Sequence, residues 1–206
     1  MISLQVTNLT KKFNRHTVFK ELNFEHESGV LGIAGSNGSG KSTLLKCLAY
    51  LLKPNKGEIT WKNLDDEMDQ KQVKAHIGYT APYISLYDEL SVFENLVFLL
   101  EVGGEKADEE ILHPLLDRVQ IPHLKDQMYG SLSTGQKQRA KLAAALVRDP
   151  DILMLDEPGS NLDKHGHELV SSIVKKAREE NKLVFLASND PNEISLCDEV
   201  VQIGTH

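Results

Sequence analysis

The sequence predicts an α/β fold built on a mainly parallel sheet with helices on both faces. Two observations carry this prediction. Short β-type segments alternate with helix-type segments, and one strand runs directly into a glycine-rich loop that is followed by a helix. With 206 residues, 40% of them hydrophobic and 26% charged, the chain is expected to form one domain, residues 1–206.

The strands are predicted from short runs of β-branched, aromatic and other apolar residues. Most of them are separated by segments of helical periodicity, which favours parallel pairing. The expected strands are Leu4–Val6, Val18–Phe24, Val30–Ala34, Glu58–Trp61, Ile77–Thr80, Ile152–Leu155 and Leu183–Ala187, with a last strand ending at Ile203.

The helices are predicted from apolar residues at helical spacing and from stop signals. Pro54 and Gly57 end the first helix, and the pair Gly103-Gly104 separates the second from the third. The expected helices are Thr43–Leu52, Ser91–Leu100, Asp108–Val119, Gly135–Val147 and Lys164–Glu180, with one more before the last strand. A helical insert thus separates two α/β parts.

Composition and charge exclude several classes of protein. The net charge of −7 argues against a nucleic-acid-binding surface, and the longest apolar stretch, around Leu96–Leu100, is far shorter than the roughly 20 residues that cross a bilayer. The first residues lack the apolar core of a secretory signal, so a cytosolic location is expected. Cys47 and Cys197 lie in apolar contexts and are expected to be buried thiols rather than a disulfide or a metal site.

The glycine-rich loop reads GSNGSGKST and is a complete phosphate-binding P-loop. Its glycines let backbone N–H groups approach phosphate oxygens, its lysine adds a positive charge, and its first serine after the lysine offers a hydroxyl to Mg²⁺. A chance Gly/Ser-rich turn is the alternative, which the strand–loop–helix context disfavours. The expected nucleotide contacts in the loop are Gly35, Ser36, Asn37, Gly38, Ser39, Gly40, Lys41, Ser42 and Thr43, with Ser42 also a metal ligand.

Two carboxylates, Asp156 and Glu157, end the apolar run DILMLDE. After a P-loop, such a pair is typical of a magnesium-orienting aspartate followed by a glutamate that polarises the attacking water. Solvated loop residues are the alternative. We expect Asp156 at the metal and Glu157 as the general base.

A third segment, Leu132–Gln136, has the letters LSTGQ and lies between these two motifs. In this order and spacing the three motifs make essentially the whole chain similar to the nucleotide-binding domain of ABC (ATP-binding cassette) transporters, whose signature usually reads LSGGQ. The resemblance implies a P-loop NTPase (RecA-like) core, about residues 1–82 and 150–206, with an N-terminal antiparallel β part. It also implies a helical subdomain insert of about residues 83–149.

The resemblance further implies ATP and Mg²⁺ as cofactors and a head-to-tail homodimer, with each ATP held between the P-loop of one chain and the signature of the other. Ser133 is a good N-cap, so the helix from Gly135 can direct its positive end at a γ-phosphate. Ser133, Gly135 and Gln136 are therefore expected to contact nucleotide. An ordinary capped helix is compatible with that role.

The resemblance also implies roles for three more positions of this sequence. Phe13 lies where an aromatic residue stacks on adenine, with packing in the core as its alternative, and Val18 is counted with it as a nucleotide contact. Asp163, in Ser160–Asp163, resembles the acid of the loop that crosses the dimer interface. It could also be the N-cap of the next helix.

Two departures from the family pattern stand out. Pro82 occupies the place of a glutamine that contacts Mg²⁺ and the attacking water, and it offers neither a side-chain amide nor a backbone N–H. Asn189 replaces the switch histidine; it can donate a hydrogen bond to a γ-phosphate oxygen but cannot carry a positive charge. We therefore expect hydrolysis that depends on Glu157 and Asn189 and is slow without a partner.

The resemblance predicts the ATP-hydrolysing subunit of an ABC transporter, peripheral on the cytoplasmic face through a separate membrane permease. The alternatives are a slow or degenerate nucleotide switch that regulates a partner, and a non-transport ABC ATPase. The apolar segment Tyr83–Tyr87 is expected either to receive the permease or to pack on the core. The eight histidines, including His165 and His167, are assigned to the surface rather than to a metal site.

Overall fold

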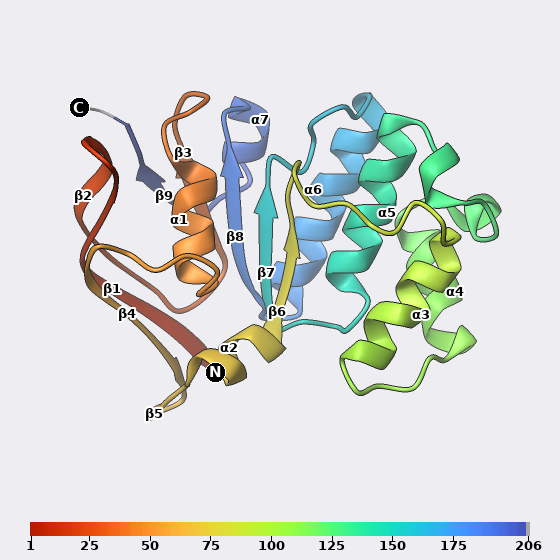
Figure 1. Ribbon diagram of the computed structural model, residues 1–206, viewed down its shortest axis with the longest axis horizontal. Coiled ribbons are helices and arrows are strands. Elements are labelled where there is room, and N and C mark those ends of the chain that lie inside the picture. Colours follow the sequence, from red (N-terminus) through yellow and green to blue (C-terminus); the bar gives the residue numbers. More distant parts are fainter. Residues whose placement is uncertain (205–206) are drawn as a thin grey trace.

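The computed structural model describes residues 1–204, which form two sheets with helices packed between and beside them (Figure 1). One sheet is antiparallel, in the order β2-β1-β4-β5, and the other has five parallel strands in the order β6-β7-β8-β3-β9. The strands are β1 (Ile2–Phe13), β2 (His16–His26), β3 (Val30–Ala34), β4 (Lys56–Asn63), β5 (Asp66–Glu67), β6 (Ile77–Thr80), β7 (Ile152–Asp156), β8 (Leu183–Ser188) and β9 (Glu199–Gln202).

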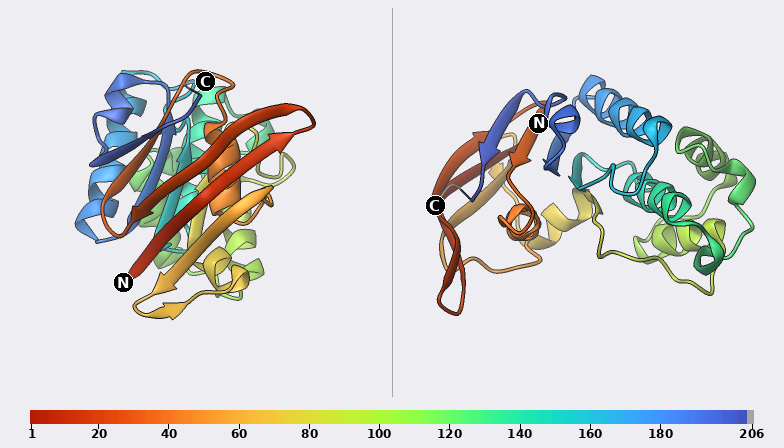
Figure 2. Two further views of the ribbon diagram at one scale, coloured as in Figure 1. Left: turned by 90° about the vertical axis from the view of Figure 1, so that its left-hand side faces the viewer. Right: turned by 90° about the horizontal axis from the view of Figure 1, so that it is seen from above.

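Seven α-helices occur within residues 1–204. They are α1 (Lys41–Leu48), α2 (Gln70–His76), α3 (Val92–Val102), α4 (Glu109–Arg118), α5 (Thr134–Leu146), α6 (Lys164–Glu179) and α7 (Pro191–Ile194), with short 3₁₀ turns at Pro122–Leu124 and Tyr129–Ser131. Helix α1 lies between the two sheets, whereas α5 and α6 cover the opposite face of the parallel sheet (Figures 1 and 2). The predicted fold class is confirmed, including the antiparallel N-terminal sheet.

Alternating side chains of the parallel strands divide the interior into two cores. In β7, Leu153 and Leu155 pack with the helices α3 to α6, while Ile152 and Met154 pack with α1 and the antiparallel sheet. The period-2 alternation of a strand puts successive side chains on opposite faces, so a strand buried on both faces is apolar throughout. Both cores therefore hold the carboxyl ends of β3, β7 and β8 in place.

Capping residues set several helix starts. Ser91 and Ser133 each form a capping box, with Glu94 and Gln136 respectively. Asp163 accepts a hydrogen bond from the Gly166 backbone N–H at 2.8 Å, so the N-cap alternative for Asp163 is confirmed. These caps begin α3, α5 and α6 within one residue of the predicted positions.

The structure corrects three element predictions. Helix α1 begins at Lys41, two residues before the expected Thr43, and ends at Leu48 rather than Leu52, because Tyr50 takes a left-handed conformation at φ 54°. The helix α2 and the short strand β5 were not predicted. Helix α2 has Val73 as its one buried residue, so its sequence carries no apolar periodicity.

The two cysteines are free thiols that differ in burial. Cys47 is buried and Cys197 only half-buried, both are free thiols, and burial raises the pKa of each to about 11. Within residues 1–204, no helix has both the length and the apolarity needed to cross a bilayer.

Candidate functional site

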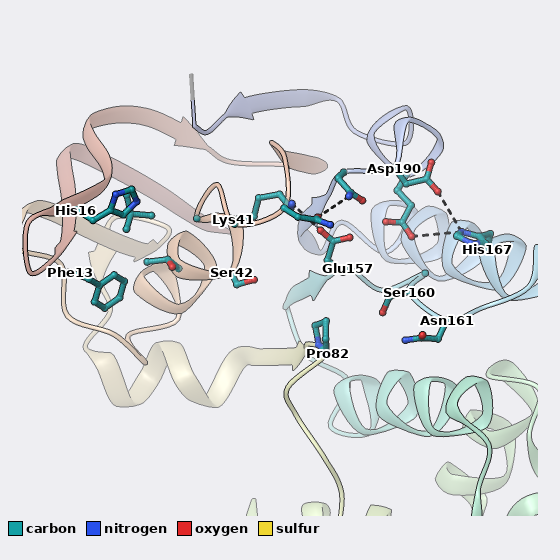
Figure 3. A pocket seen from close by; sticks show the side chains of 18 residues that line it. Phe13, His16, Lys41, Ser42, Pro82, Glu157, Ser160, Asn161, His167 and Asp190 are labelled. Atoms are coloured by element: carbon teal, nitrogen blue, oxygen red, sulfur yellow. Dashed lines mark hydrogen bonds and ion pairs between the residues drawn. The ribbon is translucent and has the colours of Figure 1, made fainter. Parts of the chain in front are cut away.

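A cavity of about 790 Å³ opens at the carboxyl ends of β3, β7 and β8 (Figure 3). This is the edge at which parallel α/β sheets bind ligands, because loops from several strands meet there. Its lining residues come from the β1–β2 hairpin, the P-loop, α1, and the segments that follow β6, β7 and β8. They are Phe13, His16, Val18, Asn37, Gly38, Gly40, Lys41, Ser42, Thr43, Pro82, Glu157, Gly159, Ser160, Asn161, His167, Asn189, Asp190 and Glu193.

The P-loop backbone depends on two glycines with positive φ. Gly38 has φ 79° and Gly40 has φ 108°, conformations that L side chains rarely adopt. A Cβ atom on Gly40 would also overlap Cγ1 of Val18. The loop can therefore lead into α1 at Lys41 while its N–H groups remain available to an anion at the helix N-terminus.

Lys41 is held inside this loop. Its Nζ atom donates hydrogen bonds to the carbonyl oxygens of Gly35 and Ser36, at 2.9 and 3.2 Å, and lies 3.0 Å from Oε1 of Glu157. The side chain is only 5% exposed. A buried ammonium with a single carboxylate partner is suited to bind a phosphate oxygen.

Asp156 is a fully buried carboxylate at the end of β7. Both of its oxygen atoms lack a hydrogen-bond partner among the described residues, and its exposed fraction is 0%. Burial raises the pKa of Asp156, which the nearby Ser42 hydroxyl opposes. An orphaned carboxylate beside a serine hydroxyl fits a divalent cation with oxygen ligands, so Asp156 and Ser42 would hold Mg²⁺. A bound Mg²⁺ would neutralise phosphate charge there.

Glu157 takes a left-handed conformation, with φ 49°, directly after β7. Its backbone N–H donates to the Ala187 carbonyl at 2.8 Å, which ties this turn to β8. Such a conformation costs on the order of 1–3 kcal/mol in a non-glycine residue and is common where function requires it. The turn directs the carboxylate of Glu157 into the cavity, opposite Lys41 (Figure 3).

The two positions that depart from the family pattern both line the cavity. Asn189 donates a hydrogen bond from Nδ2 to Oδ1 of Asn37 in the P-loop, at 2.8 Å. The segment at Pro82 is held by the buried Lys141, whose Nζ lies 3.3 Å from the Ala81 carbonyl oxygen. Asn189 therefore reaches the P-loop, whereas Pro82 contributes only a ring and a carbonyl.

The opposite end of the cavity is lined by the β1–β2 hairpin. Phe13 is 48% exposed, and the Lys11 ammonium lies over one face of its ring, 4.9 Å from the centroid. Phe13 is therefore not a core residue, and its ring is open to a planar ligand. His16 also lines this end and was not predicted, because a lone histidine in a hairpin turn gives no motif signal.

The signature residues lie outside the cavity of their own chain. Ser133, Gly135 and Gln136 are absent from the lining formed by residues 1–204, and Asp163 is absent as well. Gly135 lies at the rim, where an added Cβ would come within 3.4 Å of the Asn161 carbonyl oxygen. Three P-loop residues do not line the cavity: Gly35, Ser36 and Ser39. They form the turn of the loop, in which the Ser39 N–H donates to the Ser36 carbonyl at 3.1 Å.

Sequence reasoning missed four further lining residues, Gly159, His167, Asp190 and Glu193. Asp190 comes directly after Asn189 and Glu193 lies in the short helix that follows, so their place after a parallel strand was a usable signal. The assignment of all histidines to the surface is wrong for His26, which is 3% exposed; His206 lies outside the described residues, and the His167 side chain is 40% exposed but lines the cavity. His165, two residues away on α6, is exposed, because helical positions two apart point in different directions.

Curated relatives cover nearly the whole chain. An uncharacterized ABC transporter ATP-binding protein of Bacillus subtilis, YybJ, is 32% identical over 98% of this chain and 92% of that protein. The sulfate/thiosulfate import ATP-binding protein CysA of Pseudomonas aeruginosa is 32% identical over 97% of this chain, which spans 63% of that protein's length.

Solved structures agree with these relatives. CbiO1 of Clostridium perfringens, part of the ABC transporter complex cbiONQ, has a TM-score of 0.79 and 29% identity, over 98% of this chain and 84% of that one. The ATP-binding cassette MJ0796 has a TM-score of 0.85 over 98% of this chain and 94% of that one; at 24% identity this likeness concerns the fold alone. The family model described as ABC transporter matches residues 19–160. With the P-loop, the acid pair at the end of β7 and the signature in one order, the chain belongs to the ABC transporter family.

Proposed function

We propose that this chain is the ATP-binding and ATP-hydrolysing subunit of an ABC transporter, which dimerises around two ATP molecules and drives a separate membrane permease. The observation that carries the proposal is that Lys41 and Glu157 meet in one cavity beside the P-loop, with the buried Asp156 next to Glu157 and close to Ser42. These side chains supply a phosphate-binding cation, a magnesium ligand and a base. The relatives named as ATP-binding proteins of transporters support the transport role.

Hydrolysis requires Glu157 to be free of Lys41. In this structure the two side chains form an ion pair at 3.0 Å. A γ-phosphate carries more negative charge than one carboxylate, so bound ATP would take over Lys41 and leave Glu157 to accept a proton from the attacking water. Nucleotide binding thus activates the base.

Dimerisation is supported by where the signature lies. The first N–H groups of a helix lack partners within it, and in α5 the Ser133 hydroxyl satisfies only that of Gln136. This positive helix end sits at the rim of the cavity rather than inside it. A second copy in head-to-tail orientation would bring its own signature to the phosphate side of each cavity, which is how we propose Ser133, Gly135, Gln136 and Asp163 act.

The permease is proposed to bind at a groove of about 180 Å³ beside α3. Tyr87 and Phe98 line it with rings in edge-to-face contact, 5.1 Å apart, and they are 55% and 37% exposed. The buried amide of Asn95 fixes this loop by bonding both the N–H and the carbonyl of Tyr87, at 2.8 and 3.0 Å. A rigid groove with exposed aromatic rings suits an apolar helix of a membrane partner.

The proposal is tested by measuring Mg²⁺-dependent phosphate release from the purified protein and from its Glu157→Gln variant. We expect the variant to lose at least about a hundredfold in kcat, because general-base catalysis contributes factors of this order. ATP affinity and ATP-driven dimerisation should persist. Glu27→Gln, an exposed site away from the cavity, is the matched control. Turnover at the wild-type rate in Glu157→Gln would refute the role of Glu157.

A second candidate function, a nucleotide switch without turnover, is favoured by Pro82 and Asn189. Neither residue can position water as a glutamine side chain or carry charge as a histidine does. The same assay separates the two candidates. Wild-type protein that dimerises with ATP but releases no phosphate, alone or with its membrane partner, would support the switch and refute the transporter ATPase.

A further inference from the structure

The partly buried imidazole of His167, on α6, faces two carboxylates of the segment after β8. Its Nδ1 atom lies 3.8 Å from Oδ2 of Asp190 and 3.9 Å from Oε1 of Glu193 (Figure 3). Both distances are too long for hydrogen bonds but lie within ion-pair range. When the imidazole is protonated, it can form ion pairs with both carboxylates.

The buried carboxylate of Glu193 makes this cluster depend on the charge of His167. The Glu193 side chain is 6% exposed, and Oε1 has no hydrogen-bond partner within residues 1–204. Burial raises the pKa of Glu193, an effect that Ser188, the Gly159 backbone and the nearby His167 oppose. A buried carboxylate oxygen without a donor is costly, and the atom that faces it at ion-pair distance is Nδ1 of His167.

The cluster lies at the junction of three segments that line the nucleotide cavity. Asp190 caps α7 through Oδ1, which accepts from the Asn192 N–H at 2.8 Å, and presents its other oxygen to His167. The adjacent Asn189 is bonded to Asn37 in the P-loop. Gly159, after β7, packs so closely on His167 and Glu193 that any Cβ there would overlap both side chains.

We propose that His167 is a positioning residue for ATP hydrolysis: its charged imidazole holds the Asn189–Glu193 segment and the Gly159 loop in their places around the nucleotide. The inference rests on the proposed function. His167 acts through Asn189 and the loop after Glu157, so it should affect kcat more than KM. An imidazole changes charge near neutral pH, so the effect should depend on pH.

The groups around His167 determine the direction of that dependence. A second cavity, of about 540 Å³, opens on its other side and is lined by Lys164 and Glu168 of α6 together with Asp190 and Glu193 of the α7 segment. Three carboxylates and one ammonium thus line this cavity together with the imidazole, which solvent can reach. Loss of the imidazole proton at higher pH removes the positive charge that faces both carboxylates.

The test compares the wild type with His167→Arg, which keeps a permanent charge, and His167→Gln, which has none. We expect kcat of His167→Gln to be about two- to fivefold below that of the wild type at pH 6, the range of one partly exposed ion pair, and equal to it at pH 8.5. His167→Arg should equal the wild type at pH 6 and exceed it at pH 8.5. KM for ATP should stay within about twofold throughout. His165→Gln, on the same helix but exposed, is the control.

Amide hydrogen exchange of residues 157–161 and 189–194 at pH 6 is a measurement that does not depend on ATP hydrolysis. Exchange there should be faster in His167→Gln than in the wild type and His167→Arg. The proposal is overturned if His167→Gln lowers kcat equally at every pH without rescue by arginine, or if exchange is the same in all three proteins. Wild-type protein without ATPase activity would instead refute the proposed function. The exchange comparison would still show whether His167 holds the two segments in place.

Discussion

Asp156 is costly to the fold in the absence of a cation, and replacing it with asparagine should make the nucleotide-free protein more stable. Both of its oxygens are buried without a hydrogen-bond partner in the described part of the chain. Leaving such a group unsatisfied costs about 1–3 kcal/mol. The attraction of Lys41 and Lys46 offsets part of that cost. We therefore expect Asp156→Asn to raise the free energy of unfolding by about 1–2 kcal/mol.

This gain should be visible as a shift in Tm. One kcal/mol corresponds to about 2–4 °C in a protein of this size, so the expected increase is about 2–8 °C. Asp126→Asn, at an exposed position, should shift Tm by less than about 1 °C and controls for the loss of one charge. Differential scanning calorimetry in EDTA measures both variants.

Mg²⁺ and ATP should reverse the order of stability. A ligand at a hundred times its Kd stabilises the wild type by about 2.7 kcal/mol, and the variant, without its metal carboxylate, should gain much less. If Asp156→Asn is no more stable than the wild type in EDTA, or gains as much from Mg²⁺-ATP, the buried carboxylate is not a metal ligand.

The pH dependence follows from the direction of the pKa shift. Burial raises the pKa of Asp156 in the folded state above the ordinary value of 3.8. A raised carboxylate pKa means that the folded state binds the proton more tightly, so the destabilisation is full above the folded pKa and disappears as pH falls below 3.8. The stability difference between wild type and Asp156→Asn should therefore be largest at pH 7 to 8 and shrink on acidification.

Three other substitutions test separate parts of the site and core. Gly40→Ala should weaken Mg²⁺-ATP binding at least about tenfold in a nucleotide titration, because its backbone is left-handed and an added Cβ overlaps Val18; unchanged affinity would contradict this. Asn189→Ala removes the 2.8 Å bond to Asn37 and should lower kcat with little change in unfolding, and unchanged turnover would exclude its role. Trp61→Phe loses a buried hydrogen bond of 3.0 Å to a carbonyl of α1 and should cost about 1–3 kcal/mol in urea unfolding followed by circular dichroism.

Most of the fold could be predicted from local patterns. The parallel strands β7 and β8 were found within one residue at each end, because strands buried on both faces are apolar throughout. The starts of α3, α5 and α6 were found from their caps. Helix α2 was missed because it has a single buried residue and so no apolar periodicity. The end of α1 was misplaced because the left-handed backbone at Tyr50, rather than the composition, stops the helix.

The candidate site was predicted where residue type and spacing form a motif. Lys41, Asp156 and Glu157 belong to such motifs, and the structure brings all three to one edge of the sheet. His167 and Glu193 belong to none. They lie on different elements, and their partnership depends on how α6 packs beside α7.

The sequence by itself determined the chemistry of this protein: a phosphate-binding loop, an acid pair and a signature whose order identifies the family. These are short-range patterns, in which the reactive groups lie within a few residues of one another. Only the tertiary structure decided that Lys41 is paired with Glu157, that Asn189 reaches the P-loop, that the signature lies at the rim of its own cavity, and that His167 faces two carboxylates. Those contacts join segments far apart in the chain, and they form because parallel strands bring their carboxyl-terminal loops to the same edge of the sheet.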